Sequence, residues 1–245
     1  MSELLSDFFG FLKSPSRQIF NQSTFGDQIL EVVKLFVITF LAVIFLVVPL
    51  MTLIGADELP NKLSELENLG FDKEWQQHLA LFFLAVVFAP ILEELIFRFP
   101  LKYRRGAIAL AVLCVIAVLT NILQLIGLQM YQAMLLSGGV GLAIVLLLIM
   151  KLNQRQKLDS FSKRYYPFFF YMAALFFAFA HIFNYELEFD QLWMGPFLVL
   201  PQLILGLMLG YVRVKYGLWA SMMAHAMNNL IPTIAIILMP EGGFQ

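Results

Sequence analysis

The chain has 245 residues, of which 60% are hydrophobic and only 13% are charged. Soluble domains of this size carry about 25% charged residues, so much of this chain must lie away from water. The formal net charge of −1 predicts no nucleic-acid partner. The single cysteine, Cys114, excludes an internal disulfide and a cysteine-based metal cluster.

The first segment, 1–28, is predicted to be amphipathic. Leu and Phe are mixed with charged side chains over 1–20, which favours a helix lying on the membrane surface. A cleavable signal peptide is not expected, because acidic Glu3 and Asp7 precede the first long apolar run, which begins near Ile29.

Apolar segments follow along the rest of the chain. A membrane-spanning helix needs about 20 mostly apolar residues, and seven segments qualify: 29–54, 77–101, 107–127, 132–151, 167–184, 193–212 and 217–239. We therefore expect an all-α, polytopic transmembrane helix bundle with about seven membrane-spanning helices. Its parts are the first helix with an acidic outer loop at 29–76, an intramembrane core at 77–239 and a C-terminal tail at 240–245.

The basic residues support this arrangement. With a cytoplasmic N-terminus, 14 of the 16 Lys and Arg residues lie on the inner side, as the positive-inside rule requires. Only Lys62 and Lys73 lie outside, and a wrong helix count would scramble this pattern. We expect an integral protein of the bacterial inner membrane, in contact with membrane lipids, with its N-terminus inside and its C-terminus outside.

Few ionisable residues remain at membrane depth, where each charge costs about 2.5–3.5 kcal/mol. Glu94 and Arg98 are four residues apart, so they share a helical face and can form an ion pair. Glu93 points about 100° away and has no helical partner. The pattern fits a catalytic carboxylate, and it also fits a structural pair near the inner interface with Glu93 reaching water.

Two further polar clusters lie on later segments. Phe177 and His181 share one helical face, and a histidine there either serves a site or hydrogen-bonds a backbone carbonyl. His225 and Asn229 also share a face, and an imidazole beside a carboxamide can stabilise an oxyanion. The structural alternative for this second pair is a polar contact between helices.

The three clusters lie at similar depths. At 1.5 Å per residue, Glu93, His225 and His181 are roughly 16, 15 and 21 Å from the inner ends of their helices. A helix tilt of about 20° accommodates this difference. We therefore expect the three clusters to converge in one cavity that opens toward the cytoplasm.

In this order, the clusters resemble the CPBP family of intramembrane proteases (CAAX proteases and bacteriocin-processing enzymes, also called Abi). That family's pattern is Glu-Glu-x-x-x-Arg, Phe-x-x-x-His and His-x-x-x-Asn on separate helices, and all its residues are matched over roughly 77–239. The resemblance implies an all-helical membrane endopeptidase that cleaves a peptide or a membrane-anchored protein. Bacterial members of the family are linked to bacteriocin maturation and immunity.

The resemblance and the chemistry together predict the role of each residue. Glu93 is the expected general base, and His181 orients the attacking water. His225 and Asn229 stabilise the oxyanion. The residues expected to support this site are Glu94, Arg98 and Phe177.

Two questions stay open at this stage. The family's mechanism uses either a water activated by glutamate or a divalent metal such as zinc, which Glu93, His181 and His225 would hold as a His₂Glu set. The same polar residues would also suit a proton-coupled transporter, although no inverted repeat is visible. A third possibility is a non-catalytic immunity or scaffold protein. The oligomeric state is not predicted.

Overall fold

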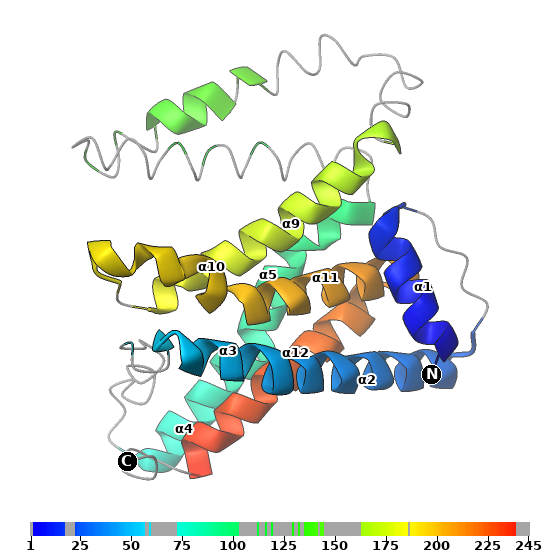
Figure 1. Cartoon of the computed structure of the whole chain (residues 1–245), viewed down its shortest axis with the longest axis horizontal. Coiled ribbons are helices and arrows are strands. Elements are labelled where there is room, and N and C mark those ends of the chain that lie inside the picture. Colours follow the sequence, from blue (N-terminus) through cyan, green and yellow to red (C-terminus); the bar gives the residue numbers. More distant parts are fainter. Residues whose placement is uncertain are drawn as a thin grey trace.

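The computed structural model describes residues 2–17, 23–56, 59, 73–102, 135–141, seven single positions between 112 and 144, 163–185 and 187–238. Its regular elements in these ranges are helices, which confirms the predicted all-α class (Figure 1). The predicted helices at 107–127 and 132–151 lie largely outside the described residues, and the tail at 240–245 lies wholly outside them.

Four helical stretches in the described ranges are long and apolar enough to cross a membrane: Phe25–Leu53, Glu74–Leu101, Phe189–Lys215 and Leu218–Leu238. A shorter apolar helix, α9, covers Tyr166–Ala180. The five stretches match five of the seven predicted segments, with bounds that differ by a few residues. The chain is therefore an integral membrane protein. Its total of seven spans and its orientation stay predictions.

The first two spans each contain a π-helix. In the first span, η1 (Val43–Val47) separates α2 (Phe25–Ala42) from α3 (Val48–Leu53). In the second, η4 (Phe83–Phe88) separates α4 (Glu74–Phe82) from α5 (Ala89–Phe97). Proline follows each π-helix by two residues, at Pro49 and Pro90. Proline has no backbone N–H, so the helical hydrogen-bond pattern must change there.

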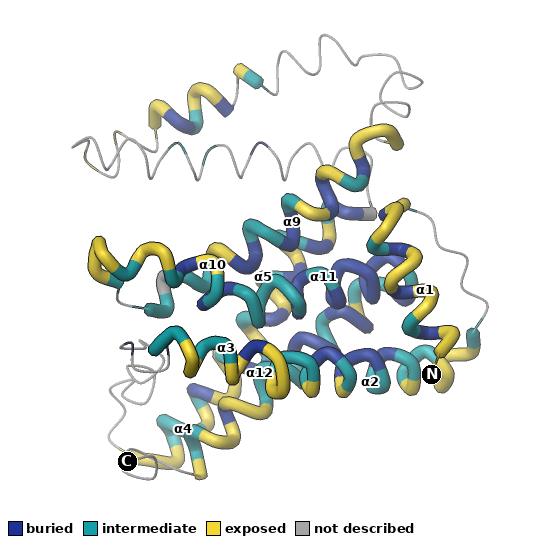
Figure 2. Tube along the Cα trace, viewed as in Figure 1, coloured by how far each residue is buried: buried dark blue, intermediate teal, exposed yellow. Residues whose placement is uncertain are grey.

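The later helices form the centre of the bundle. The 3-10 helices η5 (Phe99–Lys102), η6 (His181–Asn184) and η7 (Phe189–Met194) and the short α10 (Gly195–Leu198) connect the longer elements. Helix α11 (Leu200–Lys215) lies between α2 and α9 in Figure 1, and α12 (Leu218–Leu238) contacts α2, α5 and α11. The buried residues concentrate where these helices meet (Figure 2).

Two glycines let α11 approach α9 closely. A Cβ at Gly206 would lie 3.3 Å from the Ala174 carbonyl oxygen and 3.1 Å from the Phe177 ring. A Cβ at Gly210 would lie 2.6 Å from the Phe170 ring. Small residues at helix contacts are common in membrane bundles, because packing replaces the hydrophobic effect there.

The N-terminal helix α1 (Ser2–Lys13) is amphipathic, as the sequence predicts. Leu4, Phe8 and Phe11 of its apolar face are buried against the bundle, and its position at the membrane surface stays a prediction. Phe8 and Phe11 contact the ring of Tyr211 on α11, each with centroids 5.3 Å apart. The helix is therefore docked on protein.

Candidate active site

The site begins on α5, in the second span. Glu94 and Arg98 are one turn apart, and their Oε1 and Nη1 atoms are separated by 3.4 Å. Their side chains are 0% and 1% exposed. The predicted pair is therefore present and is buried inside the protein.

Glu94 also contacts two side chains of α12. The Nδ1 atom of His225 lies 3.1 Å from Glu94 Oε1, and the hydroxyl of Ser221 donates to Glu94 Oε2. The Glu94 carboxylate therefore contacts Arg98, Ser221 and His225, the last two from successive turns of α12. Sequence reasoning missed Ser221, although its position four residues before His225 places both side chains on one face of α12.

Glu93 points toward both histidines. Its Oε2 atom lies 3.8 Å from His181 Nε2 and 3.7 Å from His225 Nε2. This oxygen is buried and has no hydrogen-bond partner among the described residues. The distances are too long for direct hydrogen bonds. The Glu93 and His181 side chains are 27% and 22% exposed, whereas His225 is 2% exposed, so the cluster is open on the side of Glu93 and His181.

The end of α9 fixes the orientation of His181. The backbone N–H of His181 bonds to the carbonyls of Ala178 and Phe179, because the α-helix tightens into η6 at this point. The Phe177 carbonyl is thereby free to bond the side chain, and it lies 2.8 Å from His181 Nδ1. A carbonyl can only accept, so Nδ1 carries the proton and Nε2 faces Glu93.

The ring of Phe177 lies between Arg98 and the two histidines and contacts all three side chains. The Arg98 guanidinium carbon lies 3.7 Å from the centre of this ring, as in a cation–π contact. The rings of His181 and His225 meet the same phenyl group edge-on, at centroid distances of 4.8 and 5.5 Å. Gly206 lies directly behind the phenyl group, so the position of Phe177 depends on the close approach of α11.

Asn229 lies one turn beyond His225, as predicted. Its Nδ2 atom donates to the carbonyl of Ala85 in η4 at 2.9 Å, and its Oδ1 accepts from Asn228 at 3.3 Å. Among the described residues, these are its recorded side-chain hydrogen bonds, and neither joins it to Glu93. The structure therefore places Asn229 against the helix that carries Glu93.

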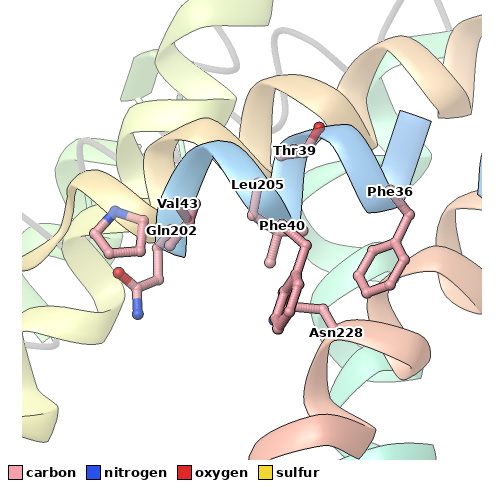
Figure 3. A pocket seen from close by; sticks show the side chains of 8 residues that line it. Phe36, Thr39, Phe40, Val43, Gln202, Leu205 and Asn228 are labelled. Carbon is pink, nitrogen blue, oxygen red and sulfur yellow. The ribbon is translucent and has the colours of Figure 1, made fainter. Parts of the chain in front are cut away.

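A small cavity of about 90 Å³ lies beside this cluster, between α2, α11 and α12 (Figure 3). Phe36 and Phe40 of α2 and Leu205 of α11 form its apolar wall, and Gln202 and Asn228 supply its polar groups. Neither Glu93 nor the histidines line it. The cavity and the Glu93 cluster therefore share no residue.

The donor chemistry at Glu93, His181 and His225 is that of a catalytic zinc site. Both histidines also have the Nδ1 contacts that support metal-bound imidazoles. The Nε2 atoms of both histidines lie within 3.8 Å of Glu93 Oε2, and metal binding at this cluster stays a prediction. Within the part of the chain that the structure describes, no three His, Cys, Asp or Glu side chains are grouped as ligands for one metal ion.

Comparison with known proteins agrees with this architecture. The family model described as "Type II CAAX prenyl endopeptidase Rce1-like" matches residues 75–231, which is more than half of the chain and includes every residue of the site. No curated protein and no solved structure matches the chain significantly. The match confirms the resemblance inferred from the three motifs: the chain belongs to the Rce1-like type II CAAX prenyl endopeptidase family, whose members are proteases.

Proposed function

We propose that this protein is an intramembrane endopeptidase that hydrolyses a peptide bond at the Glu93–His181–His225 cluster. The supporting observation is that one buried carboxylate oxygen of Glu93, which has no hydrogen-bond partner within the described part of the chain, faces the Nε2 atoms of two histidines. One water molecule bound to this oxygen would also be within reach of the ring nitrogens. The substrate is a peptide or a membrane-anchored protein that enters from the cytoplasmic side.

The two histidines have different Nδ1 partners, and this difference suggests different roles. His181 donates from Nδ1 to a neutral carbonyl, so its Nε2 has a free lone pair that would accept a hydrogen bond from the attacking water and orient it. His225 donates from Nδ1 to the Glu94 carboxylate, and in the proposed mechanism its ring acts in the doubly protonated form. Its Nε2–H would then donate to the developing oxyanion.

The charges of the site balance in this arrangement. Glu93 and Glu94 contribute two negative charges, and Arg98 and protonated His225 contribute two positive charges. A buried group of charges is tolerated when each member has a partner of opposite sign. The site could therefore hold an ionised Glu93 ready to act as a base.

The proposed reaction has two proton transfers. Glu93 takes a proton from water as the water oxygen attacks the scissile carbonyl carbon, which forms a tetrahedral oxyanion. The C–N bond then breaks, and Glu93 returns the proton to the leaving amine. Asn229 could donate to the oxyanion with its second amide N–H, since the first is bound to Ala85.

The test is cleavage by purified protein of membrane-tethered peptides, prenylated and unprenylated, with and without a metal chelator. We expect wild-type protein to release product and Glu93→Ala to release none. Loss of activity with the chelator, restored by zinc, would assign the step to a divalent metal instead. Proton-coupled flux without any cleavage would contradict the proposal and favour a transporter.

A further inference from the structure

The backbone hydrogen bonding of the second span is interrupted at the carbonyl of Ala85. In the π-helix η4, backbone hydrogen bonds join residues five apart, and the N–H of Ala89 accordingly donates to the carbonyl of Leu84. The next carbonyl, that of Ala85, would receive its hydrogen bond from residue 90. That residue is Pro90, which has no N–H to give. At membrane depth an unsatisfied carbonyl is costly.

The side chain of Asn229 supplies the missing donor. Its Nδ2 lies 2.9 Å from the Ala85 oxygen. Asn228 donates to Asn229 Oδ1 at 3.3 Å, which turns the amide so that its nitrogen faces Ala85. An asparagine from another helix thus completes the backbone of the helix that carries Glu93.

We propose that Asn229 is a positioning residue, which fixes Glu93 in the site by holding the Ala85 carbonyl that Pro90 leaves free. This role is distinct from donation to the oxyanion, and its effect on catalysis rests on the proposed function of Glu93.

The contacts between α12 and the second span show how Glu93 is held in position. Ser221, His225 and Asn229 follow one another at intervals of four residues on α12, so they share one face. Ser221 and His225 bind Glu94, and Asn229 binds Ala85. Glu93 lies between these two points of attachment in the sequence. The helix segment that carries the base is therefore held on both sides by the helix that carries His225.

The experiment is a double-mutant cycle of Pro90→Ala and Asn229→Ala, with melting temperature in detergent and kcat as separate readouts. Alanine at position 90 restores an N–H that can bond the Ala85 carbonyl without Asn229. We expect Asn229→Ala alone to lower the melting temperature by about 2–4 °C. It should lower kcat about 10²-fold with KM unchanged, the effect of misplacing a catalytic group by about 1 Å. Adding Pro90→Ala should recover part of both losses.

Asn228→Ala is the matched control, because it removes the same side chain from the neighbouring position and leaves the donor to the Ala85 carbonyl, Asn229 Nδ2, in the protein. We expect it to change both readouts less than Asn229→Ala does. If Asn229 acts only on the oxyanion, Asn229→Ala should leave the melting temperature unchanged. It should also lower kcat by the same factor in the wild-type and Pro90→Ala backgrounds. These two results together would overturn the proposal.

Two further outcomes also have a defined meaning for the proposal. If Pro90→Ala does not fold, equal melting temperatures for Asn229→Ala and Asn228→Ala contradict the proposal, and a lower value for Asn229→Ala supports it. If the wild-type protein cleaves nothing, the proposed function fails, and the melting temperatures of the cycle still test whether Asn229 holds Ala85.

Discussion

Replacing Glu94 with Gln removes the carboxylate that Arg98, His225 and Ser221 share. Arg98 is 1% exposed, and its guanidinium would be left against the ring of Phe177 with no carboxylate in contact. Removing one partner of a buried ion pair leaves an uncompensated charge and costs about 3–5 kcal/mol. We expect Glu94→Gln to lose stability of this size.

The adjacent carboxylate provides the matched control. Glu93→Gln makes the same chemical change one residue earlier on the same helix. Glu93 is 27% exposed, and its Oε2 atom lies 3.7 and 3.8 Å from the Nε2 atoms of His225 and His181. Arg98 keeps Glu94 in this variant. We therefore expect a change in unfolding free energy of less than about 1 kcal/mol.

Thermal unfolding of the two variants in detergent measures this difference. For chains of about 150–250 residues, 1 kcal/mol corresponds to roughly 2–4 °C in melting temperature. Glu94→Gln should therefore melt roughly 6–20 °C below the wild type, and Glu93→Gln within about 4 °C of it. A Glu93→Gln protein that is as unstable as Glu94→Gln would refute the division into a structural and a catalytic carboxylate.

Four further variants test the site and the packing of the helices around it. Gly206→Ala should lower kcat, because its Cβ meets Phe177 at 3.1 Å, whereas Gly210→Ala should mainly lower the melting temperature; equal kcat losses would contradict this. Ser221→Ala should cost about 1–3 kcal/mol of stability, and an unchanged melting temperature would show that Glu94 does not need the hydroxyl. Lys215→Met breaks the contacts to Asp7 and Glu31 at 3.3 and 3.4 Å, so proteolysis should cut within α1 faster than in the wild type.

Helical periodicity predicted much of the site. The spacing of Glu94 and Arg98 predicts their pair, and it leaves Glu93 without a partner on its own helix. The similar depths of Glu93, His181 and His225 predicted their approach, and the structure places both histidines within 3.8 Å of Glu93. Their catalytic roles stay predictions.

Contacts between helices could not be predicted in the same way. The bond from His225 to Glu94 depends on how α12 is rotated against α5, and the sequence does not specify that rotation. The contact of Asn229 with Ala85 depends on the π-helix before Pro90, since a regular α-helix would leave a different carbonyl free. The amphipathic pattern of α1 suits a lipid surface and a protein surface equally, so only the structure identifies what the helix covers.

In the proposed mechanism, Glu93 and His225 act on one reacting centre. The most direct test is a cycle of Glu93→Ala, His225→Ala and the double variant, with kcat measured on a membrane-tethered peptide and folding checked for each protein. Residues that act as a unit are strongly non-additive, so the double variant should be scarcely slower than either single one. Wild-type cleavage by His225→Ala, or a double variant whose loss is the product of the two single losses, would contradict the account.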